Sequence, residues 1–152
     1  MIYIGSAPRP QPVAPEVMER AKHAAQAALA HQSAQGDLTL VFTDDTQLQN
    51  LNRDYLGIDA PTDVLSFPAS EKDPDTGASY LGDILISIPR AIAQAQAAGQ
   101  LLEAEVQLLV VHGVLHLLGH DHAEAGEKSR MWAAQDEILQ NIGLAGLEIR
   151  ES

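Results

Sequence analysis

Short segments in which apolar and polar residues alternate, or in which β-branched residues gather, predict four strands in this chain. The clearest is "DLTLVFT", and the others read "IYI", "PTDVLSFP" and "LGDILISI". These segments cover residues 2–4, 37–43, 61–68 and 81–88. Between the last two, "ASEKDPDTGAS" (69–79) is polar and rich in turn formers, so we expect a mobile loop there.

Apolar residues at helical spacing predict five helices. The first begins at Pro15, because proline is favoured in the first turn of a helix. A short helix that carries Leu48 follows, with Thr43 or Asp44 as its cap. The last three run from Pro89 to about Gly99, from Leu101 to Leu118, and from about Glu124 to Ile142. The middle one of these three is apolar nearly all round, which predicts a helix buried in the centre of the fold.

The predicted elements follow the order β-α-β-α-β-β-α-α-α, with no internal repeat and no long linker. This order predicts one α+β domain over residues 1–152, in which a small mixed β-sheet packs against helices. A chain of 152 residues is long enough to bury a substantial core.

Composition narrows the chemistry that the chain can use. Cysteine is absent, which excludes disulfides and thiolate metal ligands and leaves His, Asp and Glu as possible ligands. The first residues, "MIYIGSAPRPQP", lack the basic leader and apolar core of a signal peptide. No apolar run approaches the roughly 20 residues of a membrane span. We therefore expect a cytoplasmic protein that does not enter a membrane.

The formal net charge is −12, and it is unevenly distributed. Residues 1–36 carry a net charge of +1, and the rest of the chain carries −13. A general nucleic-acid binder is expected to be basic. Any function on RNA would therefore need a local cationic patch or a larger partner.

Four of the six histidines lie in the stretch "HGVLHLLGHDH", from His112 to His122. Since His112 and His116 are four residues apart, a helix brings both imidazoles to one face, where they can bind one metal ion. Gly119 predicts the end of that helix, because glycine readily adopts the left-handed conformation that ends one. If the chain turns back there, His122 rather than His120 returns to the metal.

The spacing H-x-x-x-H-x-x-G-x-x-H matches the metzincin ligand frame. It predicts one zinc ion per chain, held by His112, His116 and His122. Three protein ligands leave a fourth position open, as in catalytic zinc sites, although a structural site could fill it with a fourth ligand such as Asp121 or an acid elsewhere. Gly113 stands where H-E-x-x-H peptidases carry their catalytic glutamate, so the pattern counts against peptide hydrolysis.

Three motifs together resemble the YbeY family of metal-dependent endoribonucleases. They are "LNRDYLGIDAPTDVLSFP" (51–68), "LGDILIS" (81–87) and the histidine stretch (112–122). The resemblance implies an α+β fold and a zinc enzyme that cleaves single-stranded RNA. It also implies a role in ribosomal RNA maturation, notably at the 3′ end of the small-subunit RNA, and in ribosome quality control. The family's three zinc histidines match His112, His116 and His122.

One position departs from the family pattern. The family often carries an arginine directly after the tyrosine of the first of these motifs, and this chain has Leu56 there. Arg53, three residues earlier, is our candidate for a contact with substrate phosphate.

The residues leave the attacking group and the general base open. A zinc ion with an open position can lower the pKa of bound water to about 7 and polarise a phosphoryl oxygen. Either that hydroxide or the 2′-OH of the substrate could attack phosphorus. Asp121 and His120 are candidate bases, and either could instead orient a metal ligand. Two other functions remain open: a non-catalytic ribosome assembly factor with a structural zinc and, with less support, a zinc peptidase.

Overall fold

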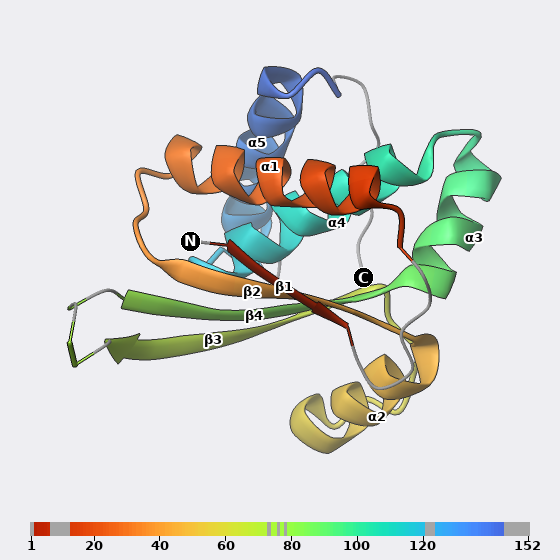
Figure 1. The fold of residues 1–152 in the computed structure, drawn as a ribbon, viewed down its shortest axis with the longest axis horizontal. Helices are drawn as coiled ribbons and strands as arrows, with labels where there is room; N and C mark the ends of the chain where they lie inside the picture. Colours follow the sequence, from red (N-terminus) through yellow and green to blue (C-terminus); the bar gives the residue numbers. More distant parts are fainter. Residues whose placement is uncertain are drawn as a thin grey trace.

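The computed structural model describes residues 2–6, 13–72, 74, 75, 77, 79–120 and 124–144. Over these residues the helices and strands follow the predicted order (Figure 1). They are β1 (Ile2–Ser6), α1 (Pro15–His31), β2 (Asp37–Thr43), α2 (Asp45–Leu56), β3 (Val64–Lys72), β4 (Ser79–Ser87), α3 (Ile88–Ala98), α4 (Leu102–Leu117) and α5 (Ala125–Asn141).

The strands form one mixed sheet in the order β1-β2-β4-β3. Strands β1, β2 and β4 are parallel, and β3 pairs antiparallel with β4. Because β3 stands at the end of this order, its outer side is an edge of the described sheet. The predicted α+β fold with a small mixed sheet is confirmed.

Strand β3 differs from the prediction at both ends. The segment predicted as a strand, 61–68, enters the sheet only at Val64, and the strand continues to Lys72. Backbone pairing with β4 extends it into the segment predicted as a loop, with Lys72 opposite Ser79. Pro68 lies where the register shifts, which is consistent with its lack of an N–H to donate to the ladder.

Helix α4 lies in the centre of the fold, as its uniform apolarity predicts. Of its 16 residues, 12 are buried, including polar Gln107 and Glu105. Helix α1 packs against it with a face of small alanines that are fully buried, which lets the two helices approach closely. Figure 1 shows α1, α4 and α5 on one side of the sheet and α2 on the other. None of the described helices has the length and apolarity that a membrane crossing requires.

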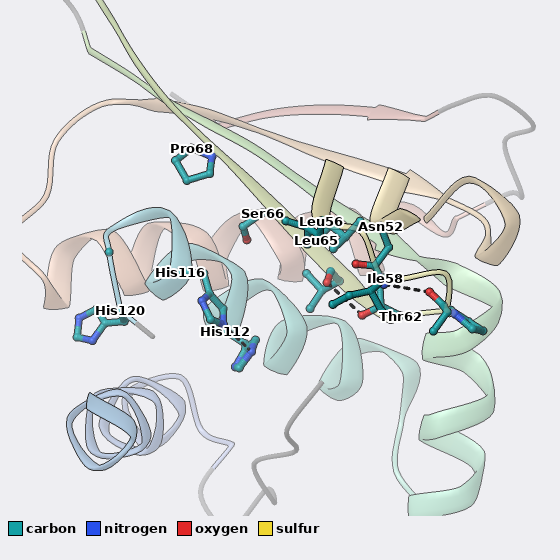
Figure 2. A pocket seen from close by; sticks show the side chains of 14 residues that line it. Asn52, Leu56, Ile58, Thr62, Leu65, Ser66, Pro68, His112, His116 and His120 are labelled. Atoms are coloured by element: carbon teal, nitrogen blue, oxygen red, sulfur yellow. Dashed lines mark hydrogen bonds between the residues drawn. The ribbon is translucent and has the colours of Figure 1, made fainter. Parts of the chain in front are cut away.

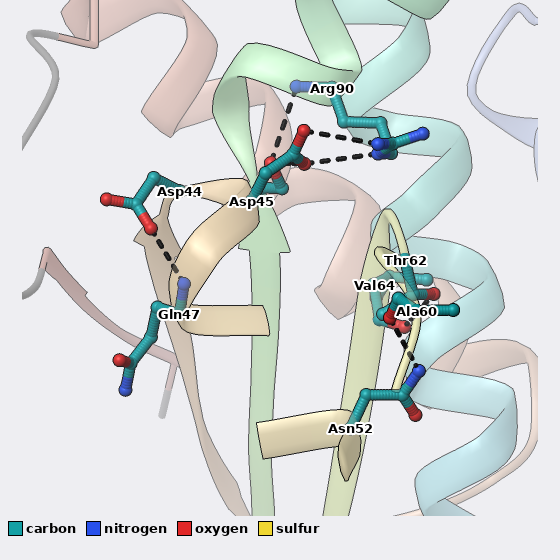
Figure 3. A network of polar contacts seen from close by, with 9 residues as sticks. Asp44, Asp45, Gln47, Asn52, Ala60, Thr62, Val64 and Arg90 are labelled. Atoms are coloured by element: carbon teal, nitrogen blue, oxygen red, sulfur yellow. Dashed lines mark hydrogen bonds and ion pairs between the residues drawn. The ribbon is translucent and has the colours of Figure 1, made fainter. Parts of the chain in front are cut away.

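The first turn of α2 is held at the carboxyl ends of β2 and β4 (Figure 3). Asp44, one of the two predicted caps, accepts a hydrogen bond from the backbone N–H of Gln47 at 2.8 Å. The carboxylate of Asp45 accepts hydrogen bonds from Ser87 Oγ at 2.7 Å and from Nε and Nη2 of Arg90 at 3.1 and 3.2 Å. This network ties α2 to the start of α3.

Two opposing effects act on the pKa of Asp45. Partial burial alone would raise it, whereas the hydrogen bonds from Arg90 and Ser87 and the positive charge of Arg90 lower it. The lowering effects prevail, so the pKa of Asp45 lies below its ordinary value and the carboxylate stays charged when the chain is folded.

We expect Asp45→Asn to lower the stability near neutral pH by at most about 1 kcal/mol, because both partners of the pair are about a third or more exposed and solvent screens them. The Tm would fall by roughly 2–4 °C. Since the folded pKa is depressed, this contribution is complete above the unfolded pKa of about 3.9 and is lost as the pH falls through the folded value.

Thermal unfolding of both chains between neutral and acidic pH tests this expectation. The Tm difference between wild type and Asp45→Asn should shrink towards low pH. The matched control is Asp54→Asn, which removes a more exposed carboxylate whose pairing with Arg53 should contribute little. A constant Tm difference across the pH range would contradict the network's contribution.

Candidate functional site

Two histidines converge on one face of α4. His112 and His116 lie one turn apart, and their Nε2 atoms are 3.1 Å from each other (Figure 2). The rings meet edge to face, with centroids 4.7 Å apart. His112 is only 5% exposed, and His116 is half-buried. The two side chains therefore present nitrogen atoms to the same small volume, as the spacing predicts.

A buried glutamine orients the deeper imidazole. Gln135, on α5 and 1% exposed, places its Oε1 atom 3.0 Å from Nδ1 of His112. With the amide oxygen as the nearer atom of Gln135, Nδ1 of His112 is the donor, which leaves the lone pair on Nε2 when the ring is neutral. Such a hydrogen bond behind a histidine is the usual way in which proteins orient a metal-binding imidazole.

The separation of the Nε2 atoms of His112 and His116 fits two ligands of one zinc ion. Two Zn–N bonds of about 2.0–2.1 Å at a tetrahedral angle would hold the nitrogens about 3.3 Å apart. The observed 3.1 Å is close to that separation. Within the described residues, no group of three His, Asp or Glu side chains forms a complete metal site. The predicted third ligand, His122, and the candidate base Asp121 lie outside those residues.

The predicted end of the histidine helix is confirmed. Helix α4 ends at Leu117, and Gly119 has φ +96°, a backbone conformation that favours glycine. The next residue folds back, because the N–H of His120 donates to the carbonyl of Leu115 at 3.0 Å. His120 therefore does not continue the row that His112 and His116 form.

The side chain of His120 forms a hydrogen bond with a residue at the end of α1. Its Nε2 atom lies 2.8 Å from Oε1 of Gln32, the residue that follows the last turn of α1. Figure 2 shows the ring of His120 apart from the His112–His116 pair. This contact joins the turn after α4 to the end of α1.

Gly113, between the two histidines, faces the sheet. A Cβ atom here would lie 2.7 Å from Cγ2 of Ile84 and 3.3 Å from Oγ of Ser66. The hydroxyl of Ser66 also donates to the carbonyl of Gly113 at 2.9 Å. No side chain fits here unless Ile84 or the helix backbone shifts. The position that holds glutamate in H-E-x-x-H peptidases is therefore closed by packing in this chain.

A cleft of about 660 Å³ opens beside the histidine pair. It lies along β3, between the end of α2 and the end of α4 (Figure 2). Its described lining is Asn52, Leu56, Ile58, Ala60, Pro61, Thr62, Val64, Leu65, Ser66, Pro68, His112, His116, Gly119 and His120. None of these residues is Asp, Glu, Lys or Arg, so the described lining has no permanent charge.

The end of α2 forms the rim of this cleft. Leu56 and Ile58 line it, while both remain more than half exposed. Arg53, the predicted phosphate contact, is not one of the lining residues, and its Nε atom lies 3.0 Å from Oδ1 of Asp54. That carboxylate raises the pKa of Arg53 through its hydrogen bond and its charge.

Most of this chain is similar in sequence to known proteins. A family model described as Endoribonuclease YbeY matches residues 9–143. A relative of that name from Moorella thermoacetica is 44% identical over 142 residues, which are 88% of this chain and 91% of the relative. Another, from Halalkalibacterium halodurans, is 44% identical over 129 residues, or 78% and 81% of the two chains. This chain belongs to the YbeY family.

The family resemblance that the three motifs carry is thereby confirmed, and the relatives are named as endoribonucleases, a class of hydrolase. A solved structure supports the fold. The solution structure of TM1509 from Thermotoga maritima matches with a TM-score of 0.57 at 22% identity, over 93% of this chain and 91% of that one. At this identity the likeness supports the fold alone.

Two contacts of this candidate site could not be found from the sequence. Gln135 lies 23 positions after His112 on another helix, in a segment whose pattern predicts only a helix. Ser66 lies in the recognised "PTDVLSFP" motif, but nothing local indicates that its hydroxyl bonds to α4. Both contacts arise where separate elements pack together.

We expect Gly113→Ala to destabilise the fold by about 1–3 kcal/mol, because the new methyl group would overlap Ile84 in a well-packed core. The matched control is Gly126→Ala on α5, where the nearest atom to an added Cβ is Nη1 of Arg130 at 3.6 Å. That change should leave the stability equal or raise it by up to about 1 kcal/mol. Chemical denaturation of both variants measures the difference, and equal stabilities would contradict the packing argument.

Proposed function

We propose that this chain is a zinc-dependent endoribonuclease specific for single-stranded RNA. It acts in ribosomal RNA maturation, at the 3′ end of the small-subunit RNA, and in ribosome quality control. Family membership supports RNA cleavage. The observation that carries the metal dependence is the pair of Nε2 atoms, 3.1 Å apart, beside an open cleft.

In this proposal one zinc ion is held by His112, His116 and His122. When bound, the ion supplies a Lewis acid that polarises the phosphodiester and acidifies a water ligand. Gln135 keeps the lone pair of His112 Nε2 directed at the metal. The buried α4 holds the two helical ligands on one face, so little reorganisation of the backbone accompanies metal binding.

The candidate proton acceptors are Asp121 and His120. The bond from His120 to Gln32 favours a positioning role for that histidine and leaves Asp121 as the stronger candidate base. Arg53 is retained as a phosphate contact from the end of α2. Its pairing with Asp54 would have to open for that contact to form.

The closed position at Gly113 counts against a zinc peptidase of the H-E-x-x-H type, which needs a glutamate there. The second candidate function is a ribosome assembly factor in which zinc only joins α5 to α4. The acidic chain and the uncharged described lining of the cleft favour it, because neither attracts RNA phosphates.

We expect the purified chain to contain about one zinc ion, and we expect His112→Ala, His116→Ala and His122→Ala each to lose it. His23→Ala, which changes an exposed histidine on α1, should keep it. Elemental analysis measures the metal content. If His120→Ala lost the ion while His122→Ala kept it, the assignment of the third ligand would be wrong.

The same variants test the activity. A nuclease-free preparation should cleave single-stranded RNA and leave casein intact, and His116→Ala should not cleave RNA. Cleavage of casein instead of RNA would support the peptidase. Absence of both activities, with zinc present and ribosome association retained, would support the assembly factor.

We expect Gln135→Met to weaken zinc binding by about 10–100-fold, because Nδ1 of His112 loses its acceptor and the ring loses its fixed tautomer. Gln135→Glu retains an acceptor and should bind nearly as well as wild type. Gln140→Met changes an exposed glutamine of the same helix and serves as the control. Chelator competition measures the affinity, and nitrogen NMR of the metal-free chain reports the tautomer. An unchanged tautomer and affinity in Gln135→Met would refute the orienting role.

A further inference from the structure

We infer that Leu56 and Ile58 form an apolar subsite that binds an unpaired nucleobase of the RNA substrate. This inference deepens the proposed function and rests on it, because RNA is taken as the polymer in the cleft. The subsite would recognise the base rather than the phosphate, and it would do so at the rim of the cleft that holds the histidine pair.

The first observation is a concentration of exposed apolar side chains. Among the described residues, five large apolar side chains are exposed, and three of them lie within four consecutive positions. Tyr55 is 70% exposed, Leu56 58% and Ile58 54%. Single exposed apolar residues need no explanation, but a group beside a polar site indicates a binding surface. Leu56 and Ile58 belong to the same cleft lining as His112 and His116.

The second observation is that hydrogen bonds hold this rim on both sides of Ile58. Gly57 ends α2 in the left-handed conformation, and the N–H of Ile58 donates to the carbonyl of Asn52 at 3.2 Å. The side chain of Asn52 in turn donates to the carbonyl of Ala60 at 3.0 Å (Figure 3). These bonds fix the path of the chain on both sides of Ile58. A surface that is ordered before binding loses little conformational entropy when a ligand arrives.

Tyr55 extends the same surface away from the cleft. Its ring meets that of Phe67 on β3 edge to face, with centroids 5.6 Å apart. The phenol is therefore held in place although most of it is exposed. An aromatic ring next to an aliphatic pair offers room for a neighbouring base to stack.

The absence of charged residues in the described cleft lining indicates that this surface fits a base of RNA better than a phosphate. The chain carries a net charge of −12, and the described cleft lining has no permanent charge of either sign. A phosphate gains nothing from Leu56 or Ile58, whereas a base has an apolar face that water solvates poorly. Bases are free to make such contacts in single strands, while in a duplex they are stacked and paired. The subsite thus gives a physical reason for a preference for single strands.

A partner protein fits these observations less well. The apolar group is small and shares the cleft with the histidine pair, so a protein seated on it would cover the site where substrate must enter. A base bound there instead places the adjoining backbone in the cleft.

The test is equilibrium binding of a labelled single-stranded RNA of about 12 nucleotides, in EDTA so that the RNA stays intact. We expect the double variant Leu56→Ser/Ile58→Ser to bind about 5- to 50-fold more weakly than wild type. The slope of log affinity against log salt should stay unchanged, since an apolar contact releases no counterions. The matched control is Leu101→Ser, which changes an exposed leucine before α4 and should bind as wild type does.

A second measurement separates base from phosphate contacts. Replacing single nucleotides by abasic sites should weaken binding to wild type at one position and leave binding to the double variant unaffected. Leu56→Arg should steepen the salt slope by about 0.7, the value for one phosphate contact on a single strand. Thermal unfolding checks that the double variant is folded. If it is not, Leu56→Gln/Ile58→Gln takes its place.

The outcomes distinguish the two proposals. If wild type binds and cleaves RNA but the double variant binds equally well, the subsite is wrong and the proposed function stands. The subsite is also wrong if the double variant keeps RNA binding but loses association with ribosomal proteins. If wild type neither binds nor cleaves RNA, the proposed function fails and the subsite fails with it.

Discussion

The close approach of α4 to the sheet at Gly113 is the contact on which the rest of the site depends. Without a Cβ, the helix backbone comes near enough for Ser66 to bond to its carbonyl and for Ile84 to fill the space beneath. This contact holds His112 and His116 beside β3, where the described sheet has an edge and a cleft can open. The same contact leaves no room for the glutamate of a zinc peptidase. Packing therefore requires glycine at position 113 and excludes the glutamate that an H-E-x-x-H peptidase needs there.

The buried imidazole of His112 requires a hydrogen-bond partner. His112 is almost fully buried, and an imidazole without a hydrogen bond there would destabilise the fold. Gln135 meets this need from α5 and at the same time leaves Nε2 as the atom that faces His116. At the opposite wall of the cleft, the network of Asp45 and Arg90 holds α2 in place, and α2 carries the apolar rim. Hydrogen bonds between separate elements therefore position both walls of the cleft.

Much of this protein can be predicted from patterns that span only one or two helical turns or a single strand. The order of the elements, the cap at Asp44, the burial of α4 and the end of that helix before Gly119 all follow from such patterns. The convergence of His112 and His116 also follows, since residues four apart on a helix always share a face. The motifs around them were sufficient to indicate the family.

Contacts between distant segments could be decided only by the tertiary structure. The sequence contains no signal that Gln135 meets His112, that the cleft brings Leu56 and Ile58 beside the histidine pair, or that β3 continues to Lys72. Each depends on strand order, on helix packing or on pairing with β4, and the free energy of such contacts is shared among many residues. The sequence alone therefore determined which side chains could bind a metal. The packing of α4, α5 and β3 determined how they are oriented and what surface a substrate meets.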